Sequence, residues 1–95
     1  MIERHITFSV HPDRTAEFER FFAEDYAPEM AKSPGFVRVE LLREAENDAG
    51  YQMVLRFRDA EASLAWRTSP VHQGLQPALN ALVSSSVVQG YVVVG

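Results

Sequence analysis

The sequence predicts an α+β fold, in which a four-stranded antiparallel sheet carries helices on one of its faces. Two observations support this fold class. Segments in which apolar and polar residues alternate, as in half-buried strands, are interspersed with segments whose apolar residues recur every three or four positions, as in helices. Their order is strand, helix, strand, strand, helix, strand, which in a chain of 95 residues indicates a ferredoxin-like βαββαβ sandwich. Residues 1–95 contain no linker or repeat, so we expect one domain.

The first strand is predicted over residues 2–10, because apolar residues occupy alternate positions in its second half. Those residues, which share one face, are Ile6, Phe8 and Val10. His11-Pro12-Asp13 ends the strand, and Asp13 can cap the long amphipathic helix that follows. Pro28 is expected to kink or fray this helix, and Ser33-Pro34-Gly35 is expected to end it. Its apolar stripe consists of Phe18, Phe21, Phe22, Tyr26 and Met30.

The second and third strands are predicted to pair as a hairpin. In the second strand, Val37, Val39 and Leu41 share one face. In the third strand, every second residue from position 51 to position 57 is apolar and shares a face. The polar segment 44–50 between them is expected to form the turn.

Two short helices and a last strand complete the chain. Asp59 can cap a helix over about residues 60–68, and Ser69 can cap the next helix, with Pro70 at its first position. The apolar stripe of this second helix consists of Leu75, Leu79, Leu82 and Val83. Residues 84–86, all serine, are expected to end the helix, and residues 87–94 are predicted to form the last strand.

The last strand is apolar on both faces, as expected of a strand that is buried on both sides. An apolar strand at an open edge would promote aggregation, so we expect a second copy of the chain to cover it. We therefore predict a homodimer that forms by sheet-to-sheet packing and through the C-terminal strand. Four charged residues on the sheet face away from the helices are expected to form cross-strand pairs or to bridge the subunits: Arg38, Glu40, Arg56 and Arg58.

Composition and charge exclude several function classes. The chain is 46% hydrophobic and 23% charged, which is typical of a globular protein. Its net charge is -4 and its basic residues are scattered, so nucleic acid is not an expected partner. The expected location is the cytoplasm, because neither a secretion signal nor a membrane-spanning segment is apparent. Cysteine is absent, and His5 and His11 have no carboxylates spaced to form a metal site with His72, so neither a metal nor another cofactor is expected.

The junction of the two short helices carries the main candidates for function. Trp66 either packs in the core or forms one wall of a pocket, where its flat ring would suit an aromatic ligand. His72 falls in the first turn of a helix, where the dipole disfavours imidazolium, so it is a candidate general base or else a surface residue near the cap. Tyr26 either packs in the core or directs its hydroxyl toward the pocket. Phe22 and Met30 either belong to the core or line an apolar wall that binds substrate.

Several of these residues resemble the antibiotic biosynthesis monooxygenase family of the dimeric α/β-barrel superfamily. The resemblance lies in the turn Ser33-Pro34-Gly35-Phe36, in the strand end Leu55-Arg56-Phe57-Arg58-Asp59, and above all in Trp66 followed by Ser69-Pro70-Val71-His72. It implies a homodimer whose two sheets form a barrel, with a separate pocket in each subunit between helices and sheet. It also implies oxidation of electron-rich aromatic compounds by O2 without metal or flavin.

The leading hypothesis is therefore a cofactor-independent monooxygenase that acts on a small phenol or quinol. Trp66 would stack on the substrate, His72 would remove a proton and Tyr26 would hydrogen-bond a carbonyl. The alternatives are a non-catalytic dimeric module for small-molecule binding or stress response, and haem binding or degradation. Haem degradation is the weaker of the two, because the haem-degrading branch carries an asparagine on the first strand and this chain has none there.

Overall fold

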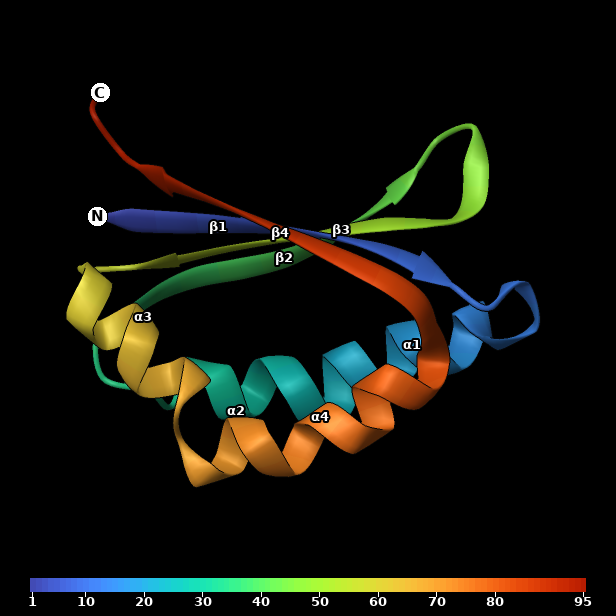
Figure 1. Ribbon diagram of the computed structural model, residues 1–95, viewed down its shortest axis with the longest axis horizontal. Helices are drawn as coiled ribbons and strands as arrows, with labels where there is room; N and C mark the ends of the chain where they lie inside the picture. The colour runs from blue at the N-terminus through green and yellow to red at the C-terminus, as the bar shows by residue number, and fades with distance from the viewer.

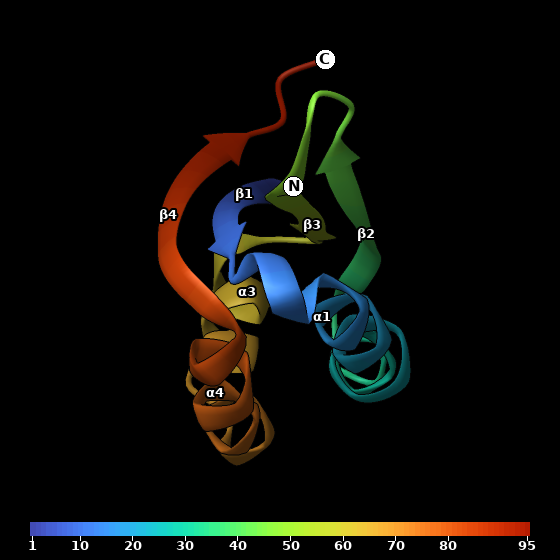
Figure 2. The ribbon, with the colours of Figure 1, turned by 90° about the vertical axis from the view of Figure 1, so that its right-hand side faces the viewer.

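The computed structural model describes all residues 1–95 and shows a curved sheet with every helix on one side of it (Figure 1). The elements, in order, are β1 (Ile2–Val10), the 3-10 turn η1 (Pro12–Arg14), α1 (Thr15–Phe21), the π-helical turn η2 (Phe22–Tyr26), α2 (Ala27–Ala31), β2 (Phe36–Glu44), β3 (Asn47–Phe57), α3 (Ala60–Arg67), α4 (Pro70–Leu82) and β4 (Val83–Val92). Viewed end-on, α4 and the α1 region lie side by side beneath the sheet (Figure 2).

The sheet has the strand order β2-β3-β1-β4, and all neighbouring strands are antiparallel. This topology confirms the predicted ferredoxin-like α+β fold. The two central strands, β1 and β3, pair over most of their length, from Ile2↔Phe57 to Ser9↔Gly50. The edge strands are β2 and β4, so the predicted last strand lies at an open edge of the single chain.

The hydrophobic core fills the space between the sheet and the helices, and the predicted alternation identifies most of it. The sheet contributes Phe8, Val10, Tyr51, Met53, Leu55 and Phe57, and the helices contribute Phe18, Tyr26, Met30, Ala62, Trp66, Leu79 and Leu82. Aromatic rings contact one another edge-on within this core, as in the pair Phe8 and Phe18 with centroids 5.4 Å apart. Apolar burial of this kind is the main source of stability in so small a domain.

The first helical region is irregular just before Pro28, where the sequence predicts a kink. The irregularity is a π-helical turn, in which the amide of Ala27 donates to the carbonyl of Phe22 five residues earlier. Pro28, which has no N–H to donate, directly follows this turn within a continuous helical stretch, so the irregularity lies where a regular α-helical hydrogen bond cannot form. The cap predicted at Asp13 is wrong, because this residue lies inside η1 and the residue that precedes α1 is Arg14.

The turn from α2 to β2 requires a glycine. Gly35 has φ of +80°, and a Cβ on it would lie 2.6 Å from the Cβ of Ala62. Its carbonyl accepts a hydrogen bond of 2.7 Å from the amide of Arg58, which ties the turn to the end of β3. The predicted stop at Ser33-Pro34-Gly35 is confirmed.

Three predicted boundaries or faces differ from the structure. A register shift between Phe36 and Arg38 reverses the alternation at the start of β2, so Phe36 packs on the core and Val37 is exposed. Strand β3 begins at Asn47, because Glu44 pairs with Asn47 and only two residues form the turn. Strand β4 begins at Val83, so the serines predicted to end α4 lie in the strand, which pairs with β1.

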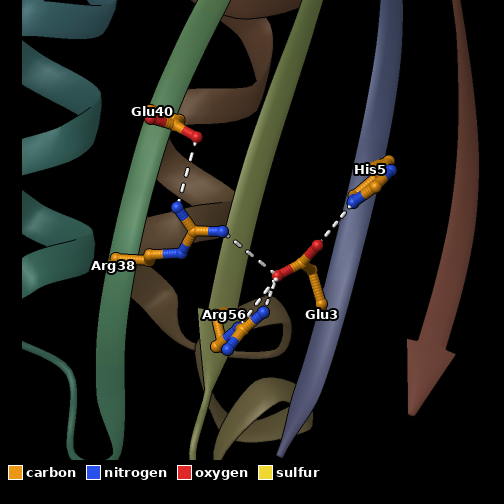
Figure 3. Close-up of polar contacts among 5 residues, drawn as sticks. All are labelled: Glu3, His5, Arg38, Glu40 and Arg56. Carbon is orange, nitrogen blue, oxygen red and sulfur yellow. Dashed lines mark hydrogen bonds and ion pairs between the residues drawn. The ribbon is translucent and has the colours of Figure 1, made fainter. Parts of the chain in front are cut away.

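The sheet face away from the helices carries a charged network centred on Glu3 (Figure 3). Glu3 accepts from Arg56 at 2.8 Å and pairs with His5 at 2.7 Å, while Arg38 bridges Glu3 and Glu40. Hydrogen bonds from His5 and Arg56 lower the pKa of Glu3 to about 2. The predicted cross-strand pairing is confirmed for Arg56. It is wrong for Arg58, which pairs with its neighbour Asp59 instead.

Candidate functional site

A cavity of about 200 Å³ lies where α3, α4 and the first helical region meet the sheet. Fourteen residues line it, and eight of them are hydrophobic. The volume is below the ~300–1,000 Å³ of pockets for drug-sized ligands, so the cavity suits a small molecule. Its walls include three of the predicted site residues, which come from three different elements: Tyr26, Trp66 and His72.

These three side chains form an edge-to-face cluster. The ring centroids of Trp66 and His72 lie 5.2 Å apart at an interplanar angle of 77°, and those of Tyr26 and Trp66 lie 5.8 Å apart at 89°. The rings of Tyr26 and His72 are 6.3 Å apart. Trp66 and Tyr26 are buried, at 3% and 2% exposure, and both still line the cavity. Each therefore serves both the core and the cavity wall, although the sequence presented these as alternatives.

Local capping explains how the cluster is held in place. Asp59 accepts from the amide of Ala62 at 2.8 Å and so begins α3, which carries Trp66. The hydroxyl of Ser69 donates to the carbonyl of Trp66 at 2.8 Å and accepts from the amide of His72 at 3.1 Å. One serine side chain thus joins the end of α3 to the start of α4, and both predicted caps are confirmed.

The environment keeps the His72 imidazole neutral. Burial lowers the pKa of His72 from its ordinary value, the nearby Arg67 backbone carbonyl opposes this shift, and the charges of Arg4 and Arg67 lower the pKa further. Its Nδ1 atom is buried and has no hydrogen-bond partner. A buried nitrogen without a partner costs free energy, so a ligand that offers a partner would stabilise the site.

The phenol of Tyr26 stays protonated near neutral pH. Burial raises its pKa to about 12, while the Trp66 indole and the charge of Arg4 act in the opposite direction. Tyr26 can therefore donate a hydrogen bond into the cavity, but it does not serve as a base near neutral pH.

The structure does not bring the other two predicted residues to this cavity. Met30 is fully buried in the core, with no exposed surface. Phe22 lies beside a separate shallow hollow with Leu41 and Tyr51. Neither side chain is part of the cavity wall that Trp66 and His72 form.

The cavity also contains polar residues that the sequence pattern did not single out. Gln76 and Asn80 follow His72 on α4 at steps of four, so the helical period alone could have placed them on its face. Arg4 falls on the same side of β1 as Ile6 and Phe8, and strand alternation could have revealed it. The remaining polar residues of the wall are Arg67 and Ser86.

No three His, Asp or Glu side chains come together in an arrangement that could hold a metal ion. No helix is both long enough and apolar enough to cross a membrane.

Comparison with known proteins is consistent with this geometry. No curated protein matches the chain significantly. Among solved structures, a mutant form of SnoaB of Streptomyces nogalater, a cofactor-independent oxygenase, is 33% identical with a TM-score of 0.89, and the alignment covers 97% of this chain and 91% of SnoaB. A second SnoaB structure is 32% identical, with a TM-score of 0.87 and coverage of 99% and 93%. A Caulobacter crescentus protein assigned to the antibiotic biosynthesis monooxygenases is 21% identical, with a TM-score of 0.89 and coverage of 99% and 90%, and supports the fold alone.

The family model described as antibiotic biosynthesis monooxygenase matches residues 1–78. This segment includes Tyr26, Trp66 and His72, and it ends within α4. The match spans most of the chain and agrees with the predicted resemblance, so this chain belongs to the antibiotic biosynthesis monooxygenase family.

Proposed function

We propose that the chain is a cofactor-independent monooxygenase that oxidises a small phenol or quinol in the cavity between Trp66, Tyr26 and His72. The observation that carries this proposal is a neutral imidazole with an unpartnered buried nitrogen, set against two aromatic rings in a small cavity. The similarity to SnoaB, a cofactor-independent oxygenase at 33% identity, supports the same class of chemistry.

In this proposal, His72 acts as the general base. It removes the phenolic proton of a substrate whose ring lies against Trp66, and its neutral form at neutral pH has the capacity to accept that proton. Tyr26, which remains protonated, donates a hydrogen bond to the substrate oxygen as negative charge develops there. The phenolate is an easily oxidised anion, and this property makes a direct reaction with O2 accessible.

The proposed reaction balances without a further reductant. For a phenol that carries hydrogen on the ring carbon opposite its oxygen, the phenolate gives one electron to O2, and the two radicals combine to form a carbon–oxygen bond at that carbon. The peroxide takes up a proton, the ring carbon then loses its own proton, and the O–O bond breaks. Hydroxide leaves and is protonated to water. The sum is phenol plus O2 giving quinone plus water. A quinol has no hydrogen on that ring carbon, and its oxidation balances instead as quinol plus O2 giving quinone plus hydrogen peroxide.

Oxygen uptake by metal-stripped protein with a panel of hydroquinones, anthrones and catechols tests the proposal. We expect uptake above the spontaneous rate, and a fall of roughly 10²-fold or more in His72→Ala, as for loss of a general base. His11→Ala is the matched control, because it removes an imidazole that does not line the cavity. Unchanged uptake in His72→Ala would contradict the assigned base. Binding without turnover across the panel would instead support the non-catalytic binding module.

We also propose that the protein is a homodimer formed through the open face of the sheet. On β4, Val87 is 66% exposed and Tyr91 is 47% exposed, and both pair with residues of β1 that face away from the helices. Apolar side chains on an edge strand favour pairing with another chain. The cavity with its volume of about 200 Å³ does not favour haem, which is a much larger ligand.

A further inference from the structure

Two arginines without acidic partners lie beside the aromatic cavity. Arg4, on β1, and Arg67, at the end of α3, both line the cavity and both line a neighbouring hollow of about 260 Å³ beside Gly90. No aspartate or glutamate lines either space. The two charges are close enough that Arg67 lowers the pKa of Arg4, in addition to the larger effect of burial.

This arrangement is unusual for this chain, which carries 13 acidic and 9 basic residues. Six of the basic residues form ion pairs: Arg14, Lys32, Arg38, Arg43, Arg56 and Arg58. Arg4 and Arg67 form none, although both are only partly exposed. The Nε atom of Arg67 is buried without any hydrogen-bond partner.

Local structure leaves room for a ligand at this point. Arg4 lies on the helix-facing side of β1, and its partner on the edge strand is Gly90. A Cβ placed on Gly90 would meet nothing within 4 Å, so the edge strand leaves open space in the hollow that Arg4 and Gly90 both line. Like charges that share a partly buried wall repel each other and lose hydration, and an anion between them would offset both effects.

We infer that Arg4 and Arg67 form a subsite for a carboxylate, and that the substrate class of this cavity is an aromatic carboxylic acid. The ring lies against Trp66, and the carboxylate lies toward the hollow, where planar guanidinium groups hold it by charge-assisted hydrogen bonds. This inference rests on the proposed function for the position of the ring, but it concerns binding and requires no turnover.

Trp66 is the only tryptophan of the chain, so quenching of its fluorescence reports occupancy of the cavity. The probes are benzoate, 2-naphthoate and anthracene-2-carboxylate, each compared with its neutral carboxamide of the same shape. We expect at least one acid to bind on the order of tenfold more tightly than its amide, and to lose that advantage as salt is raised.

The variants Arg4→Gln and Arg67→Gln are expected to weaken binding of the acid on the order of tenfold each, and to leave binding of the amide unchanged. Arg67→Lys should recover part of the loss, because it keeps the charge without the planar fork. Arg20→Gln is the matched control, since Arg20 is exposed, forms no ion pair and lies outside both spaces. Thermal melts show whether each variant is folded. If Arg4→Gln disturbs the sheet because Arg4 lies on β1, Arg67→Gln still tests the inference, because Arg67 lies on α3.

The inference is overturned if no acid binds better than its amide, or if neither glutamine variant changes the binding of the acid. Failure of the oxygenase proposal would appear differently, as an acid preference that depends on both arginines without any oxygen uptake.

Discussion

The rings of Trp66 and His72 lie 5.2 Å apart because the hydroxyl of Ser69 bonds to the backbone of both residues. Trp66 lies near the end of one helix and His72 near the start of the next, so their relative position depends on a turn of a few residues. The Ser69 side chain is therefore a structural element of the site.

Ser69→Ala should disturb both stability and the site. Loss of a helix cap costs about 1 kcal/mol, and here the same side chain also anchors the preceding helix. We expect a lower unfolding midpoint in urea and a shifted emission maximum of Trp66. Ser85→Ala is the matched control, because Ser85 is exposed and lies outside the cavity wall. Equal unfolding midpoints for the two variants would show that the hydrogen bonds of the Ser69 hydroxyl do not stabilise the protein.

The rate of catalysis should depend on pH through the titration of His72, with a midpoint below the pKa of an ordinary histidine. Burial lowers the pKa of His72 below 6.5, and the neutral form is the proposed base. The rate should therefore be constant above neutrality and fall on acidification with a midpoint below 6.5, which is lower than for an exposed histidine. The measurement is kcat/KM against pH for any substrate found in the panel. A midpoint above 6.5 would contradict the assignment.

Glu3→Gln should make the protein less stable at neutral pH and less sensitive to acid. The folded-state pKa of Glu3 is about 2, against an ordinary value of 4.5, so its stabilisation is complete above 4.5 and is lost as pH falls toward 2. After allowance for solvent screening we expect a loss of roughly 1 kcal/mol at pH 7.

Urea unfolding at pH 7 and pH 3 measures both effects of Glu3→Gln. Glu40→Gln is the control, because Glu40 is half exposed and pairs only with Arg38. A parallel loss of stability in the two variants at both pH values would argue against a special role for Glu3.

Val87→Glu should prevent association of the subunits. This exposed valine lies on the open face of β4, where a charge in the proposed interface would be desolvated without a partner. Light scattering at micromolar concentration should give a dimer mass for the unmodified protein and a monomer mass for this variant. Leu64→Glu, on an exposed position of α3, should leave the mass unchanged. A monomer mass for the unmodified protein would refute the dimer.

The sequence predicts the fold well because its strands and helices carry clear periods. Alternation places Phe8, Tyr51 and Phe57 in the core, and the two cap residues of the short helices are found in their predicted roles. The errors occur where contacts between elements determine which face of a strand is buried or where a strand begins. The reversal of faces at Val37 depends on a bulge against β3, and the serines after α4 become strand because this segment pairs with β1.

The site was predictable in part for the same reason. Spacing along the first helix selected Tyr26, the junction of the two short helices selected Trp66 and His72, and the structure brings their rings together. Alternation could place Arg4 on the cavity side of β1, but it could not predict the proposed role of Arg4, which depends on the absence of a carboxylate from both spaces that it lines. An absence of this kind is a property of the folded chain, and local sequence does not show it.

The π-helical turn at Phe22–Tyr26 changes the directions in which side chains point before and after it in the first helical region. In an unbroken α-helix, residues twelve positions apart point about 120° away from each other, because each residue turns by about 100°. The turn absorbs one extra residue and reduces that angle to roughly 20°, so Phe18 and Met30 can both be buried against the sheet. Removal of one exposed residue from the turn, such as Glu24, would therefore leave the two ends in the same relative rotation, but it would place Pro28 inside an α-helix, where proline removes a backbone hydrogen bond and clashes with the preceding turn.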